Sequence, residues 1–133
     1  MTNIVLVGFK RSPFTIANKG LLAGVRPEDI LSQVINDLIK TTNINKDDIE
    51  DIIAGCAYPE GAQGYNIAKI VSFMTDMPEH VGGMTINRWC GSSMQAIHSA
   101  AGAIAMNAGK VFICCCIESM SSVPINGLNY SPH

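Results

Sequence analysis

The sequence has no excess of basic residues. Lysine and arginine total 9 and aspartate and glutamate total 11, which gives a formal net charge of -2. Nucleic acids and anionic membranes are recognised by clustered basic side chains, and no basic stripe runs along this chain. The charge balance therefore argues against both classes of partner.

The sequence also lacks an apolar run long enough to cross a bilayer. Its first residues lead directly into the apolar stretch 4–7, without a charged leader or a small-residue cleavage site. The five cysteines are an odd set with three adjacent members, which does not fit a disulfide framework and is typical of a reducing compartment. From these absences we expect a cytoplasmic protein without a membrane partner.

No linker, internal repeat or low-complexity segment divides the chain. Its 133 residues, 47% of them hydrophobic, suffice for one domain with a core. Helical patterns separate four short apolar runs, which we predict to be strands over 4–9, 52–57, 83–87 and 111–117. This alternation predicts an α/β fold with a mostly parallel sheet and helices on both faces.

Three helices are predicted between these strands. The first opens at Pro27 with acidic residues in its first turn, and the second has its apolar stripe over 67–74. The third, over 92–107, is apolar on almost its whole circumference, which predicts burial on nearly every side. A domain of this size cannot provide that cover alone, so we expect a further domain or subunit to pack against the helix.

Cys90 lies where the third strand is predicted to end and the third helix to begin. The first N–H groups of a helix and its dipole favour negative charge, which favours a thiolate at such a position. Gly91 permits a tight turn, and Ser92 and Ser93 suit a first helical turn. A buried small hydrophobe at this junction is the alternative, and the local sequence leaves both interpretations open.

The chain shows no general base for this cysteine. His98 is eight residues along the same helix, which places it about 12 Å up the axis and beyond hydrogen-bond reach. His80 follows a loop and His133 is the last residue, so no periodic element positions either one. A complete Cys/His pair is therefore not predicted.

The triplet Cys114, Cys115 and Cys116 raises the question of a metal site. On a strand the outer two side chains would share one face, about 6.6 Å apart along it, and the middle one would point to the other face. Structural zinc sites draw pairs of ligands from turns, and no second pair is present. We predict no metal and interpret the triplet as buried packing.

Several motifs together resemble the thiolase family. The segment 87–97, Asn-Arg-Trp-Cys-Gly-Ser-Ser-Met-Gln-Ala-Ile, resembles the thiolase nucleophile motif, most closely that of the fatty-acid-degrading 3-ketoacyl-CoA thiolases. Residues 11–14, 61–69 and 118–121 resemble other thiolase segments in the same order and spacing. The resemblance implies a three-layer α/β/α thiolase half-domain with a mostly parallel sheet over residues 1–133. It implies that an insertion and a second half, with a catalytic histidine and another cysteine, are absent.

The resemblance also implies an activity. Cys90 would be the catalytic nucleophile of an acetyl-CoA C-acyltransferase, which cleaves 3-ketoacyl-CoA to acetyl-CoA and a shortened acyl-CoA or runs the reverse Claisen condensation through an acyl-cysteine. Coenzyme A would be a substrate rather than a cofactor, and the assembly a homodimer or a dimer of dimers. The 133 residues alone would be inactive. The alternatives are another condensing enzyme of the same fold and a non-catalytic, acyl-binding thiolase-like protein.

The chain departs from the family at two positions. Thiolases usually carry glycines where Cys115 and Cys116 stand. Because larger side chains need room, we expect local repacking around this strand. The departure leaves the segment around Cys90 unaffected.

Overall fold

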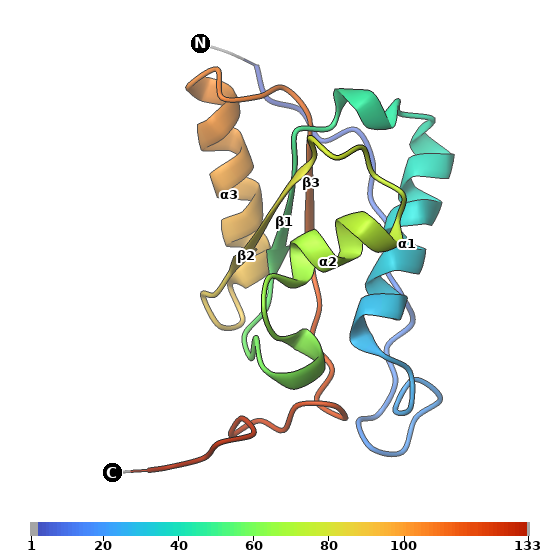
Figure 1. Ribbon diagram of the computed structural model, residues 1–133, viewed down its shortest axis with the longest axis vertical. Helices are drawn as coiled ribbons and strands as arrows, with labels where there is room; N and C mark the ends of the chain where they lie inside the picture. Colours follow the sequence, from blue (N-terminus) through green and yellow to red (C-terminus); the bar gives the residue numbers. More distant parts are fainter. Residues whose placement is uncertain (1–2, 133) are drawn as a thin grey trace.

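Three parallel strands form the central sheet of the molecule (Figure 1). The computed structural model describes residues 3–132. The strands are β1 (Asp51–Gly55), β2 (Gly82–Ile86) and β3 (Phe112–Cys116), in the order β2-β1-β3. In the middle of the sheet Ile53 pairs with Met84 on one side and with Cys114 on the other. The predicted strands at 52–57, 83–87 and 111–117 are thus confirmed, each with ends shifted by one or two residues.

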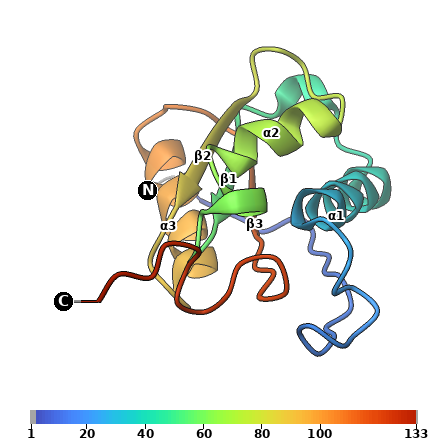
Figure 2. The same cartoon turned by 60° about the horizontal axis from the view of Figure 1, so that its bottom comes forward.

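Helices cover both faces of this sheet (Figure 2). α1 (Pro27–Thr42) and α2 (Ile67–Met74) lie on one face, and α3 (Ser92–Ala105) lies on the other. Two short 3-10 turns, Lys46–Asp48 and Gly61–Gln63, complete the regular structure of the described residues. The predicted three-layer α/β/α half-domain is confirmed.

Alternation along β1 divides the core between the two faces. Ile52 and Ala54 pack with Val71 and other buried residues on the side of α1 and α2. Ile53 packs with Ala96 and Ala100 of α3 on the opposite side. A strand covered on both faces needs consecutive apolar residues, which is why the continuous run predicted this strand correctly.

The helix ends follow the local signals in the sequence. Pro27 is the first residue of α1, with Glu28 and Asp29 in the first turn. Asn43 ends α1 in the left-handed conformation with φ 53°, and its N–H donates to the Ile39 carbonyl. Asn66 caps α2 by accepting a hydrogen bond from the Lys69 N–H at 3.4 Å.

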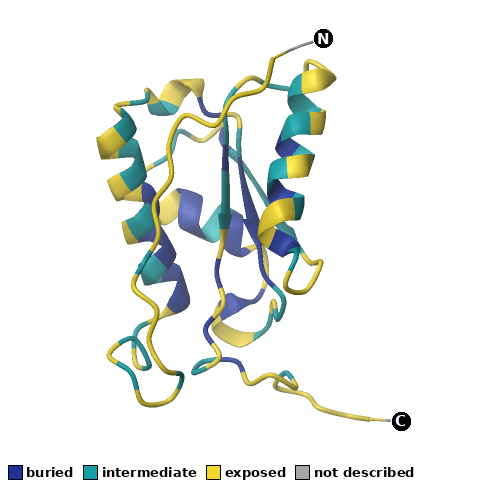
Figure 3. Cartoon of the chain, turned by 180° about the vertical axis from the view of Figure 1, so that it is seen from behind, coloured by how far each residue is buried: buried dark blue, intermediate teal, exposed yellow. Residues whose placement is uncertain are grey.

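The predicted strand at 4–9 is wrong. Residues 4–14 form an extended strap that makes no backbone–backbone hydrogen bond within the described part of the chain. Both edges of β1 are already paired with β2 and β3, so the apolar run has no partner in the middle of the sheet. The strap instead crosses the outside of the molecule (Figure 3), with Val5 72% and Leu6 79% exposed. Lys10 Nζ anchors it to Asp37 Oδ2 at 2.7 Å.

The third helix is covered on one side only, as expected for a chain of this size, and its cover by a further domain or subunit stays a prediction. α3 buries Ser92, Ala96 and Ala100, whereas Met94 is 57% exposed. The sheet covers only one side of the helix, and no element between residues 3 and 132 packs on the other. α3 ends at Ala105 rather than at 107. No helix among the described residues is long and apolar enough to span a membrane.

Candidate active site

Cys90 lies in the turn that leads from the end of β2 into α3. The residue is exposed, and the first residue of the helix is Ser92. The predicted position at a strand-to-helix junction therefore agrees with the structure, and the alternative of a buried small hydrophobe does not. Its catalytic role stays a prediction.

Hydrogen bonds within the turn fix the backbone around Cys90. The Trp89 N–H donates to Asn87 Oδ1 at 2.9 Å. The Ser92 hydroxyl accepts from the Arg88 N–H at 2.8 Å and donates to the Trp89 carbonyl at 2.6 Å. Trp89 has a φ of 50°, a left-handed conformation that is uncommon for a bulky residue. Because this conformation is unfavourable by itself, the surrounding bonds must hold it in place.

Gly55, at the end of β1, allows α3 to begin close to the sheet. A Cβ atom at this position would lie 2.6 Å from the Ser92 carbonyl carbon and 2.8 Å from the Ser92 Cβ. Only glycine fits this approach without a shift of the helix start. Gly55 lies inside the predicted strand 52–57, where a lone glycine is the local signal of close backbone contact.

Two motifs that are far apart in the sequence meet beside this turn. Gln63 is fully buried, and its Nε2 donates to Glu118 Oε1 at 2.8 Å and to the Tyr58 carbonyl at 2.9 Å. Its Oε1 accepts a hydrogen bond from the Ser119 N–H. Gln63 and Glu118 lie in the segments 61–69 and 118–121, which resemble thiolase segments, but no local pattern marks either side chain as part of a site. Their pairing is a tertiary contact without a local signal.

Burial distinguishes the other cysteines from Cys90. Burial, helped by the negative charge of Glu118, raises the pKa of Cys56 to about 12. Burial also raises the pKa of Cys114, of Cys115 and of Cys116, although Cys116 is exposed as a residue. These four thiols are therefore poor nucleophiles near neutral pH.

The cysteine triplet alternates across the sheet as predicted. Cys114 Sγ lies 3.5 Å from the Ala96 carbonyl of α3, whereas Cys115 Sγ lies 3.7 Å from the Ile53 carbonyl on the other face. Cys115 packs against the core on the side of α1 and α2, where a glycine would leave space. Within residues 3–132 no group of three or more histidine, cysteine or acidic side chains could hold a metal ion.

Neither described histidine is bonded to Cys90. His80 precedes β2, at the opposite end of the strand from Cys90, and His98 is exposed on α3. No hydrogen bond within residues 3–132 involves the side chain of either one. His133 lies outside the described residues.

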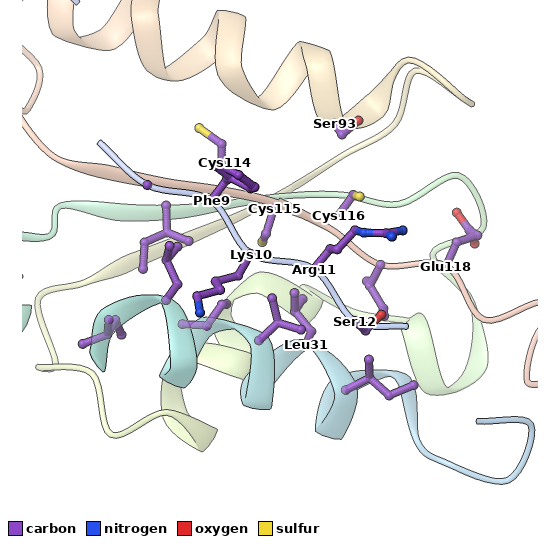
Figure 4. Close-up of a pocket in the computed structure, with 18 of the residues that line it drawn as sticks. Phe9, Lys10, Arg11, Ser12, Leu31, Ser93, Cys114, Cys115, Cys116 and Glu118 are labelled. Atoms are coloured by element: carbon purple, nitrogen blue, oxygen red, sulfur yellow. The ribbon is translucent and has the colours of Figure 1, made fainter. Parts of the chain in front are cut away.

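A cavity of about 720 Å³ lies between the strap, α1 and β3. Figure 4 shows Arg11 extending from the strap toward the end of β3, where Cys116 and Glu118 also line the cavity. Cys90 is not among the lining residues, and Ser93 is the nearest contribution from the start of α3. The cavity exists because the strap stands away from the sheet, and it does not enclose the candidate nucleophile.

Comparisons with known proteins show the family to which the chain belongs. A family described as "Thiolase, N-terminal domain" matches residues 4–130. The 3-ketoacyl-CoA thiolase of Aeromonas salmonicida (strain A449) is 37% identical over 99% of this chain, and that of Shewanella frigidimarina (strain NCIMB 400) is equally similar. The 3-ketoacyl-CoA thiolase of Colwellia psychrerythraea (strain 34H / ATCC BAA-681) is 36% identical over 94% of the chain.

The match covers nearly all of this chain but only part of each relative. The chain spans 35% of the Aeromonas and Shewanella proteins and 33% of the Colwellia protein. With a matching family over residues 4–130, an α/β/α architecture and an exposed cysteine at the start of α3, this chain belongs to the thiolase family, as part of its N-terminal domain.

Proposed function

We propose that this chain supplies the nucleophilic cysteine of a 3-ketoacyl-CoA thiolase. The observation that carries the proposal is the exposed Cys90 in a fixed turn at the start of α3, while burial raises the pKa of the other four thiols. The names of the relatives favour a thiolase over other condensing enzymes. We further propose that 3-ketoacyl-CoA, acetyl-CoA and coenzyme A are its substrates and products.

The proposed reaction has two steps. The Cys90 thiolate attacks the keto carbonyl carbon of 3-ketoacyl-CoA, and the bond between C2 and C3 of the acyl chain breaks. The electron pair of that bond leaves on C2, which takes up a proton and departs as acetyl-CoA, while the rest of the chain remains as a thioester on Cys90. The thiolate of a second coenzyme A then attacks this thioester and releases the shortened acyl-CoA and the Cys90 thiolate. Division into two steps lowers each barrier.

The position of Cys90 at the helix start supports this chemistry. Negative charge develops on the carbonyl oxygen during each attack, and backbone N–H groups near the start of a helix are suited to stabilise it. We propose the Cys90 N–H as one such donor. We propose that the proton for C2 comes from a group outside the described residues, because neither His80 nor His98 is bonded to Cys90.

Assembly and location are part of the same proposal. We propose that copies associate as dimers or dimers of dimers, because α3 and the strap expose Met94, Leu6 and other apolar side chains. We also propose that coenzyme A takes part as a substrate rather than as a resident cofactor and that the protein acts in the cytoplasm.

Selective alkylation tests the proposed nucleophile. The folded protein is treated with sub-stoichiometric iodoacetamide at pH 7, and the adducts are mapped by mass spectrometry. We expect Cys90 to be modified first, because it is exposed, whereas burial raises the pKa of each of the other four thiols. Cys90→Ser should abolish the fast phase, whereas Cys116→Ser, the matched control at the other exposed cysteine, should leave it unchanged. Preferential labelling of residues 114–116 would overturn the proposal.

A further inference from the structure

Ala57, in the loop after β1, connects the end of β3 to the nucleophile turn. Its N–H donates to Glu118 Oε2 at 2.7 Å. Its carbonyl accepts a hydrogen bond from Asn87 Nδ2 at 2.9 Å. Glu118 therefore bonds the N–H of Ala57 and Asn87 bonds its carbonyl, so both side chains are joined to the same residue.

The side chain of Asn87 links Ala57 to the backbone beside Cys90. While its Nδ2 holds Ala57, its Oδ1 accepts the Trp89 N–H at 2.9 Å. The neighbouring Tyr58 adds a second contact, because its ring packs edge-on against the Trp89 ring with centroids 5.3 Å apart. The loop after β1 thus fixes both the backbone and the side chain of the residue that precedes Cys90.

Glu118 is itself held in place. Its Oε1 accepts from Gln63 Nε2 at 2.8 Å, so each carboxylate oxygen has a different partner. The Gln63 amide is fully buried and bonded at both its nitrogen and its oxygen, which prevents it from turning away. A carboxylate held in this way is a rigid attachment point for the loop.

We infer that Glu118 and Asn87 are positioning residues for Cys90, acting in series through Ala57. The inference rests on the proposed function, since it assigns these residues to the geometry of the proposed nucleophile. Their contribution is the placement of the thiol at the start of α3. Loss of the link lets the turn around the left-handed Trp89 relax and moves the thiol away from the helix N–H groups.

The direction in which Glu118→Gln changes the rate of Cys90 alkylation distinguishes a positioning role of Glu118 from an effect of its charge. Glu118→Gln keeps the shape of the side chain and removes a negative charge. The loss of an anion favours a nearby thiolate, so electrostatics alone would speed up alkylation of Cys90. Loss of positioning would slow it instead, by about two- to fivefold at the strength of a helix-end interaction.

The single tryptophan gives a spectroscopic readout for this test. Trp89 is the only tryptophan in the sequence, so its emission and its quenching by acrylamide report on the turn alone. We expect Glu118→Gln and Asn87→Ala to change the Trp89 emission and to slow iodoacetamide modification of Cys90. The double variant should be no slower than the slower single variant, because both changes break one link.

Two control variants remove similar bonds elsewhere. Glu60→Gln weakens a carboxylate that accepts the Leu128 N–H at 2.7 Å. Asn66→Ala removes the cap of α2 and the bonds of Asn66 to Gly83 and Thr85 in β2. These controls should lower the thermal midpoint without changing the Trp89 emission or the alkylation rate. If Glu118→Gln does not fold, Asn87→Ala tests the inference alone. Asn87 is exposed, so its replacement by alanine leaves no cavity in the core.

The outcomes distinguish this inference from the proposed function. Slow alkylation of Cys90 in the unmodified protein would refute the proposed nucleophile, whatever the variants do. Reactive Cys90 with an unchanged or faster rate in Asn87→Ala and Glu118→Gln would refute the positioning role alone. Fully additive losses in the double variant would show that the two residues act separately, which would also overturn the link through Ala57.

Discussion

Replacement of Gly55 by alanine tests how tightly α3 is set against the sheet. The added Cβ would lie 2.6 Å from the Ser92 carbonyl carbon, which is backbone and cannot rotate away. Ordinary carbon–carbon contact is about 3.5 Å, so the helix start must retreat by roughly 1 Å. Overpacking of this kind costs about 1–3 kcal/mol, which lowers the thermal midpoint by about 3–12 °C in a domain of this size.

Gly102→Ala is the matched control for this experiment. Gly102 lies within α3 and is exposed, and no atom lies within 4 Å of where its Cβ would be. Alanine should therefore stabilise the helix by about 0.5–1 kcal/mol, the usual gain over glycine. The same glycine-to-alanine change should thus lower the free energy of unfolding at Gly55 and raise it at Gly102.

Thermal unfolding followed by circular dichroism measures both variants. We expect Gly55→Ala to unfold at a lower temperature and Gly102→Ala at a higher one than the unmodified protein. Because the clash falls on Ser92, two residues after the thiol, Gly55→Ala should also change the rate of Cys90 alkylation. A neutral or stabilising Gly55→Ala would mean that α3 does not begin where the structure places it.

Three further predictions follow from other features. Burial raises the pKa of Asp51, so its folded-state pKa exceeds the unfolded value and stability is lost as the pH rises between the two. Asp51→Asn should therefore unfold at a higher temperature than the unmodified protein at pH 7, and the difference should vanish below pH 3.8, the ordinary pKa of an aspartate side chain. The 133-residue chain should not cleave acetoacetyl-CoA, because general acid–base help is worth about 10² to 10⁴ in rate and neither His80 nor His98 is bonded to Cys90. Turnover that depends on Cys90 would contradict this. The exposed side chains of Leu6 and Met94 should cause self-association, so sedimentation at micromolar concentration should not show a lone monomer.

The strands of the sheet were predictable because buried parallel strands have short, nearly continuous apolar sequences. Residues 52–54 and 111–115 carry this signal, and both became strands. The run at 4–9 carries it equally well but forms a strap. An apolar run indicates that a segment favours burial, whereas strand formation also requires backbone pairing with another strand, which no local pattern records; the strap pairs with neither outer edge of the sheet.

The candidate site was predictable only at its centre. The junction of an apolar strand with a helical pattern placed Cys90 correctly at the start of α3. The supporting contacts join residues that are 30 to 61 positions apart and run through the backbone of Ala57, which has no distinctive side chain. Gln63 and Glu118 looked like ordinary polar residues, because burial and pairing exist only after the chain has folded.

The strand order constrains where the chain can tolerate changes in length. β1 lies between β2 and β3, and its following loop bonds through Ala57 to both Asn87 after β2 and Glu118 after β3. An insertion in 56–60 would break the hydrogen bonds through which Ala57 links Glu118 to Asn87. The segment 75–81, which enters β2 from the opposite end of the sheet, is held as well, because Lys46 Nζ donates to the Thr75 carbonyl at 2.7 Å and Lys69 Nζ donates to the Val81 carbonyl at 2.6 Å. Length variation during divergence is therefore expected in neither of these connections.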